Sequence, residues 1–228
     1  MKIENCTLLY SLTAKQWKFR EENDGRVSAL KALKCPDGIT VIKPVMEFSG
    51  DIVKPDEFAS VFRNAIESYR GDEISRFKLK KEHPEINFEQ TMAVVDKAYD
   101  EAIRIIDVCA NADSTKFFQS MHKLGFESGI LVYPNLYTVT FSKPLSFNPG
   151  NVFIMFKVTQ YPFDDENLLC TFKEYIDYYE RNKESMIRDV IVKHPTYHSP
   201  ETAINEVIEV HTDTIKSLCK MIRGEDNE

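Results

Sequence analysis

Hydrophobic side chains recur at intervals of four and three residues along four stretches of the chain, the spacing that places them on one side of an α-helix. The first stretch begins at Pro55, a residue favoured at the first helical position, and Asp56 and Glu57 follow, where negative charge suits the helix dipole. Stripes this narrow are typical of helices that pack along one another, within one chain or across a dimer axis. The predicted stripes are Phe58, Phe62, Ala65 and Tyr69; Phe88, Met92, Val95, Tyr99, Ala102, Ile106 and Cys109; Leu168, Phe172, Tyr175, Tyr179, Asn182 and Met186; and Ile204, Ile208, His211, Ile215, Leu218 and Ile222.

Between residues 129 and 163 the hydrophobic period changes to two, the spacing of β-strands whose side chains point to alternate faces. The pattern predicts a hairpin whose second strand, over residues 152–159, follows a connection containing Asn148-Pro149-Gly150. Because this strand also carries Phe153 and Met155 on its second face, we expect another element or a partner to cover them. The core faces of the two strands are Tyr137, Val139 and Phe141, and Val152, Ile154, Phe156 and Val158.

The N-terminal part of the chain has weaker patterns. We predict a strand over residues 2–12 and a short helix that Thr13 and Gln16 open as a capping box. Residues 39–48 alternate as a strand, which Pro44 places at a sheet edge. The whole pattern predicts an α+β fold, with a small antiparallel sheet (a hairpin at about residues 130–159 plus the N-terminal strands) packed with four or five amphipathic helices. We expect one domain over residues 1–223 and an acidic disordered tail over residues 224–228.

The composition is that of a globular protein, with 43% hydrophobic and 29% charged residues among 228. Only 8 residues are glycine, where average usage of about 7% would give roughly twice as many. This shortage counts against phosphate-binding loops, and the sequence contains neither a P-loop nor a G-x-G-x-x-G segment. A G-x-S-x-G segment, which would mark a nucleophile, is also absent. The sequence therefore predicts no catalytic residue and no cofactor, and leans against an enzyme.

Cysteine usage and hydrophobicity bear on the compartment. The five cysteines are dispersed without a C-x-x-C pair, and the N-terminal apolar run is too short for a signal peptide, so we expect reduced thiols. Cys109 and Cys170 are expected to be buried on helices. No stretch approaches the roughly 20 apolar residues that span a bilayer. We therefore expect a cytoplasmic protein that has no membrane partner.

Two histidines and a glutamate stand close together in a predicted connection between helices. His194, His198 and Glu201 supply the imidazole and carboxylate ligands of divalent metals, so they form a candidate metal site of a metal-dependent enzyme. A connector with surface histidines is the simpler interpretation, because no H-E-x-x-H spacing is present. His211 lies about 15 Å farther along the next helix, too far to bind the same ion. We expect it to be a stripe residue with a hydrogen-bonded ring.

Asp96 and Asp100 lie one helical turn apart in the second predicted helix. Two carboxylates at that spacing can hold a cation or share a proton. A solvated flank of the helix is the simpler interpretation.

A basic run is the candidate for nucleic-acid binding. Arg76, Lys78, Lys80 and Lys81 surround Phe77, and cations around an aromatic ring can follow a phosphate backbone and stack a base. Acidic residues follow this run at once, and the formal net charge is −7, from 36 acidic and 29 basic residues. Both features disfavour nucleic acid as a partner.

The preferred interpretation is a non-enzymatic protein-protein interaction module. Phe153, Met155, Tyr175, Tyr178 and Tyr179 are the residue types that anchor protein interfaces, and Tyr178 stands off the helical stripe. That these side chains fill the core between a helix and the sheet is an equally good interpretation. We expect a regulator, inhibitor or assembly factor, of the kind found in viruses and mobile elements, that binds another protein and forms a homodimer.

Overall fold

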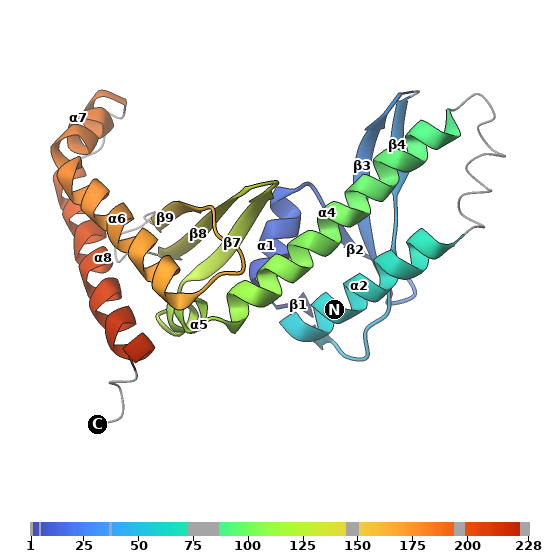
Figure 1. Cartoon of the computed structure of the whole chain (residues 1–228), viewed down its shortest axis with the longest axis horizontal. Helices are drawn as coiled ribbons and strands as arrows, with labels where there is room; N and C mark the ends of the chain where they lie inside the picture. The colour runs from blue at the N-terminus through green and yellow to red at the C-terminus, as the bar shows by residue number, and fades with distance from the viewer. Residues whose placement is uncertain are drawn as a thin grey trace. The chain divides into compact units, whose positions relative to one another are not determined.

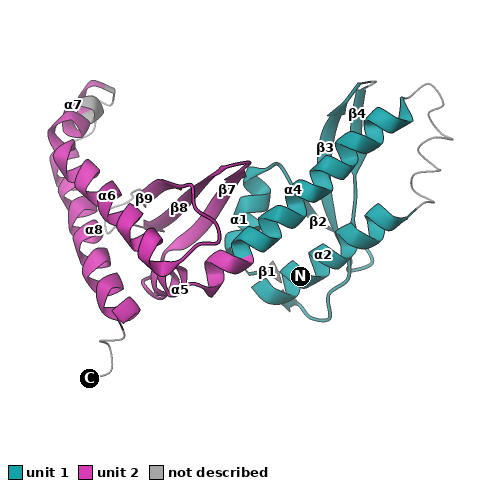
Figure 2. Ribbon diagram, viewed as in Figure 1, with its two compact units in different colours: residues 1–109 teal, residues 110–228 magenta. Residues whose placement is uncertain are grey.

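The computed structural model describes residues 2–4, 6–36, 38–72, 87–144, 151–193 and 199–223. Within these residues the chain forms seven helices and three small sheets (Figure 1), which confirms the predicted α+β class. It divides into two compact units, residues 1–109 and 110–228 (Figure 2). One domain over residues 1–223 stays a prediction, and the tail over residues 224–228 lies outside the described residues.

Unit 1 is built around its longest strand, β3, which lies in the middle of an antiparallel sheet. One side of β3 pairs with β2, and the other side pairs with β4 and β5, which lie before and after Pro44. The strand expected over residues 39–48 therefore lies at a sheet edge, as its proline requires. A further pair, β1 and β6, is parallel. The strands are β1 (Lys2–Ile3), β2 (Lys18–Glu21), β3 (Val27–Cys35), β4 (Gly38–Ile42), β5 (Val45–Met46) and β6 (Ile52–Val53).

The N-terminal segment differs from the prediction. It contains a helix, α1 (Thr7–Ala14), where a strand was expected, and strand β2 where a helix was expected. The helix is favoured because Leu8 and Leu12, one turn apart, are both buried, and because the Cys6 sulfur accepts a backbone N–H of the first turn at 3.4 Å. Gln16 takes a φ of 67°, in the left-handed region, so the chain leaves the helix there and the expected capping box does not form.

An aromatic cluster forms the core of unit 1 between its sheet and helix α2 (Pro55–Gly71), which begins at Pro55 as predicted. The rings of Trp17 and Phe62 meet edge to face at 5.4 Å, and those of Phe19 and Phe58 at 5.3 Å. Helix α4 (Phe88–Ser114) begins in this unit and buries most of the predicted stripe, while Phe88 and Met92 at its start are half-buried. Its buried stripe residues are Val95, Tyr99, Ala102, Ile106 and Cys109.

In unit 2 an antiparallel three-stranded sheet has the order β7-β8-β9. The predicted period of two is confirmed, because the inward side chains of β8 and β9 are buried and pack on rings from helices α5 and α6. Helix α8 packs along both α5 and α6, as the narrow stripes predict (Figure 1). The elements are α5 (Lys116–Lys123), β7 (Glu127–Tyr133), β8 (Leu136–Pro144), β9 (Asn151–Val158), α6 (Asp165–Arg181), α7 (Lys183–Lys193) and α8 (Pro200–Arg223).

The third predicted helix is interrupted. Its stripe was expected to continue through Met186, but α6 ends at Arg181 and α7 begins two residues later. Asn182 lies between them, and its side-chain amide donates a hydrogen bond to the Tyr178 carbonyl at 2.7 Å. That carbonyl also accepts the backbone N–H of Asn182, so the side chain supports a helix end.

Candidate functional site

The outer face of strand β9 carries two exposed hydrophobic side chains. Phe153 is 58% exposed and Met155 is 54% exposed. Ile154 between them and Val152 before them are completely buried. On the neighbouring strand β8, Phe153 and Met155 lie opposite the small polar residues Ser142 and Thr140. The alternation in the sequence therefore placed these two side chains on the correct face.

A side-chain hydrogen bond joins helix α6 to β9 at Phe153. The Tyr175 hydroxyl donates a hydrogen bond to the Phe153 carbonyl oxygen at 3.0 Å. Burial, together with the neighbouring Tyr179, raises the pKa of Tyr175 to about 12, so the hydroxyl keeps its proton at neutral pH. The bond holds the backbone of β9 where it presents the Phe153 side chain.

The other two tyrosines of the candidate interface have different surroundings. Tyr178 lies three residues after Tyr175, on an adjoining side of α6, and is 58% exposed. Tyr179 faces helix α8, where its ring meets the His211 ring at 4.9 Å. Phe153, Met155, Tyr175 and Tyr178 together are called the β9–α6 surface below, and Tyr179 supports it from the side of α8.

His211 is buried between α6 and α8, as its place in the stripe predicts. The expectation of a hydrogen-bonded ring is wrong, because neither ring nitrogen has a hydrogen-bond partner among the described residues. The ring instead packs in T-shaped contact with two tyrosine rings, Tyr175 and Tyr179. Burial lowers the pKa of His211 from 6.5 to about 4, so the ring is neutral at pH 7.

The candidate metal site lies largely outside the described part of the chain. His194 and His198 are not described, and Glu201 is exposed in the first turn of α8. Among the residues that are described, no three histidine, cysteine, aspartate or glutamate side chains gather as metal ligands would. The metal site therefore stays a prediction.

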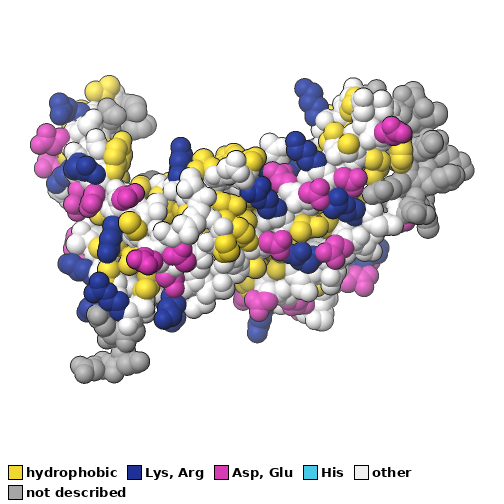
Figure 3. Space-filling view, viewed as in Figure 1, with side chains coloured by type: hydrophobic (Ala, Val, Ile, Leu, Met, Phe, Trp, Pro, Cys, Tyr) yellow, Lys and Arg dark blue, Asp and Glu magenta, His cyan; other side chains and the backbone are white. Residues whose placement is uncertain are grey.

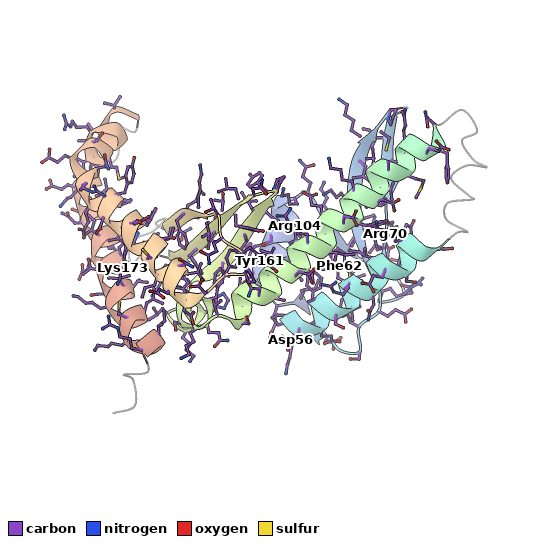
Figure 4. The ribbon with its side chains drawn as sticks, in the orientation of Figure 1. Asp56, Phe62, Arg70, Arg104, Tyr161 and Lys173 are labelled. Carbon is purple, nitrogen blue, oxygen red and sulfur yellow. The ribbon has the colours of Figure 1, made fainter. Side chains whose placement is uncertain are left out.

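The pair Asp96 and Asp100 has a partner in the neighbouring helix. Arg70 of α2 reaches across to α4 (Figure 4), where its Nε lies 3.4 Å from Asp96 and its Nη1 lies 2.6 Å from Asp100. One guanidinium thus binds both carboxylates, so the two aspartates already have a cationic partner within the chain. These aspartates join two helices of unit 1.

The basic run Arg76, Lys78, Lys80 and Lys81 lies between α2 and α4, outside the described residues. No helix in the described ranges is long and apolar enough to cross a membrane. Cys109 is buried as predicted, whereas the expectation for Cys170 is wrong: it lies on the exposed side of α6. All five cysteines are free thiols.

Sequence reasoning missed a second exposed hydrophobic set, on strand β4. Ile39 is 77% exposed and Val41 is 56% exposed. The alternation of residues 39–48 predicted the strand, but neither face of β4 itself carries a charged residue, so the pattern within β4 did not tell which face the core covers. Its absence of charge was the available signal, since natural edge strands usually carry some.

No family model, curated protein or solved structure matches the chain.

Proposed function

We propose that this chain is a protein-binding module whose β9–α6 surface binds another polypeptide, and in the first place a second copy of the chain. The proposal is supported by one observation above all: Phe153 and Met155 stand more than half exposed on a strand whose backbone is fixed by the Tyr175 hydroxyl. A backbone that is fixed before binding loses little conformational freedom on binding, and aromatic and methionine side chains are enriched at protein interfaces.

A second copy of the chain suits this surface because an isologous contact needs a patch that complements itself. Two hydrophobic residues two positions apart on one strand meet this condition when the partner strand is antiparallel. Phe153 of each copy would then lie against Met155 of the other copy. Lys157, exposed on the same face, would stay at the polar rim of the contact.

Sedimentation velocity over a concentration series tests the proposal. We expect the full chain to dimerise at micromolar concentration, and the double variant Phe153→Ser/Met155→Ser to dimerise about tenfold more weakly or not at all. A matched control is Ile52→Ser, which removes an exposed side chain of unit 1 and should leave dimerisation unchanged. A chain that stays monomeric at micromolar concentration would count against the proposal.

A further inference from the structure

The sheet of unit 1 has two very different faces. On the inner face Phe19 packs on rings of α2, and Lys31 of β3 binds Glu101 of α4. On the outer face Val41 lies opposite Ala32 and Ile39 lies opposite Lys34, and all four are exposed. Sheets are normally covered by a further layer wherever they present hydrophobic side chains. This outer face is therefore a candidate for covering by another molecule.

Cations border the exposed hydrophobic side chains. Alternation along the strands puts Lys18 and Arg20 of β2 and Lys34 of β3 on the outer face, and none of the three forms a salt bridge with a described residue. No outer-face position within the described strands β2 to β5 carries a carboxylate. Just beyond β2, Glu22 is held by Lys43 at 2.9 Å.

This local balance is opposite to that of the whole chain, whose formal net charge is −7. A patch of cations around hydrophobic side chains attracts a partner with the reverse arrangement, acidic groups around a hydrophobic stripe. On the side of unit 1 that carries α4, by contrast, Figure 3 shows cationic and acidic side chains interspersed with hydrophobic ones.

The dimensions of the face indicate the form of this partner. Strands spaced about 4.8 Å apart lie three abreast where β2 and β5 flank the start of β3, and two abreast where β4 pairs with residues 31–35, so the face is about 5 to 10 Å wide and no wider than an α-helix. From Leu30 to Lys34, where the outward side chains of β3 reach the surface, the face extends about 13 Å at roughly 3.3 Å per residue, the length of a little more than two helical turns. Helices of this kind already cover the inner face.

We propose that the outer face of the β2–β5 sheet binds an acidic amphipathic helix of a partner protein. The hydrophobic stripe of that helix would lie on the outer-face aliphatic side chains, and acidic residues at its flanks would meet Lys18, Arg20 and Lys34. This surface belongs to unit 1, so the inference is independent of the function proposed for the β9–α6 surface. The aliphatic contact residues are Leu30, Ala32, Ile39, Val41 and Val45.

Peptide display tests the inference without knowledge of the natural partner. A library of random peptides of about 16 residues is selected on the full chain, and enriched peptides are synthesised for fluorescence anisotropy. We expect enriched peptides to be acidic, with hydrophobic residues three and four apart, and to bind more weakly as salt is added. Enrichment of basic peptides, of peptides with a period of two, or of none would overturn the inference.

Three variants locate the binding. Ile39→Ser/Val41→Ser and the charge reversal Lys18→Glu/Arg20→Glu/Lys34→Glu should each weaken peptide binding by about tenfold or more. All these side chains are exposed, so the fold should survive, which circular dichroism checks. The matched control Phe153→Ser/Met155→Ser removes as much exposed hydrophobic surface from unit 2 and should leave peptide binding unchanged. Equal binding by all variants would contradict the proposed site.

Discussion

Each unit buries polar side chains, and the partners of each side chain decide what it contributes to the stability of the fold. In unit 1 the Lys31 ammonium lies on the inner face of the sheet, 5.5 Å from the centre of the Trp17 ring, and binds Glu101 at 3.0 Å. Lys15 binds the same carboxylate at 3.0 Å. Burial alone would raise the pKa of Glu101, but the hydrogen bonds from the two lysines outweigh it and the pKa is lowered.

Replacing Glu101 by alanine should therefore leave the Lys31 charge buried without its partner. We expect the free energy of unfolding to fall by about 2 kcal/mol, less than for a fully buried pair because the Glu101 side chain is partly exposed. Urea denaturation followed by circular dichroism measures the change. Glu174→Ala, on the exposed side of α6, is the control and should change stability by less than about 0.5 kcal/mol.

The burial of His211 predicts how the free energy of unfolding depends on pH. Its pKa is about 4 in the folded chain and 6.5 ordinarily, so between these values the unfolded chain binds a proton that the folded chain does not. Its contribution to stability is complete above about pH 6.5 and decreases as the pH falls to 4, at up to about 1.4 kcal/mol per pH unit. In His211→Leu this contribution should vanish, and the variant should be at least as stable as the wild type at pH 4.

The measurement is the free energy of unfolding of both proteins between pH 4 and pH 8. Subtracting the variant's curve removes the titration of the carboxylates, which the two proteins share. Parallel curves would mean that the imidazole ring is solvated or hydrogen-bonded.

At the scale of elements, regular patterns over several turns were predictable and irregular ends were not. Helices α2, α4 and α8 were predictable because their stripes persist along the whole helix. The break at Asn182 was not, because the stripe keeps its spacing through Met186 while a single side-chain hydrogen bond supports the helix end. Helix α1 was missed for the opposite reason: at eight residues it is too short to establish a period.

The hydrogen bond between α6 and β9 gives a prediction at this scale. Tyr175→Phe removes one hydroxyl and leaves the Phe153 carbonyl without this donor. We expect a loss of about 1 kcal/mol in the free energy of unfolding and weaker dimerisation, because β9 is held less firmly. Chemical denaturation and sedimentation velocity measure the two effects. Tyr178→Phe, which keeps the ring and alters an exposed hydroxyl, is the control for stability.

At the scale of the whole molecule, the chain joins two units that each expose hydrophobic side chains on one sheet. That Phe153 and Met155 lie on the second face of β9 was predictable, because the strand's other face is hydrophobic throughout, but that no element of the described chain covers them was not. The spacing already placed Tyr179 on the stripe and Tyr178 off it, but only the packing of α6 against α8 shows that Tyr179 meets His211. Which face of β4 is exposed depends on how β4 pairs with β3, and the register of that pairing could not be read from the sequence.

Hydrogen–deuterium exchange of the full chain, at submicromolar and at tens of micromolar concentration, tests most directly whether the β9–α6 surface binds polypeptide. The proposal predicts slower exchange at the higher concentration in β9 (Asn151–Val158) and in the second half of α6, and no such change for Phe153→Ser/Met155→Ser. Exchange that is independent of concentration, or protection confined to unit 1, would contradict it.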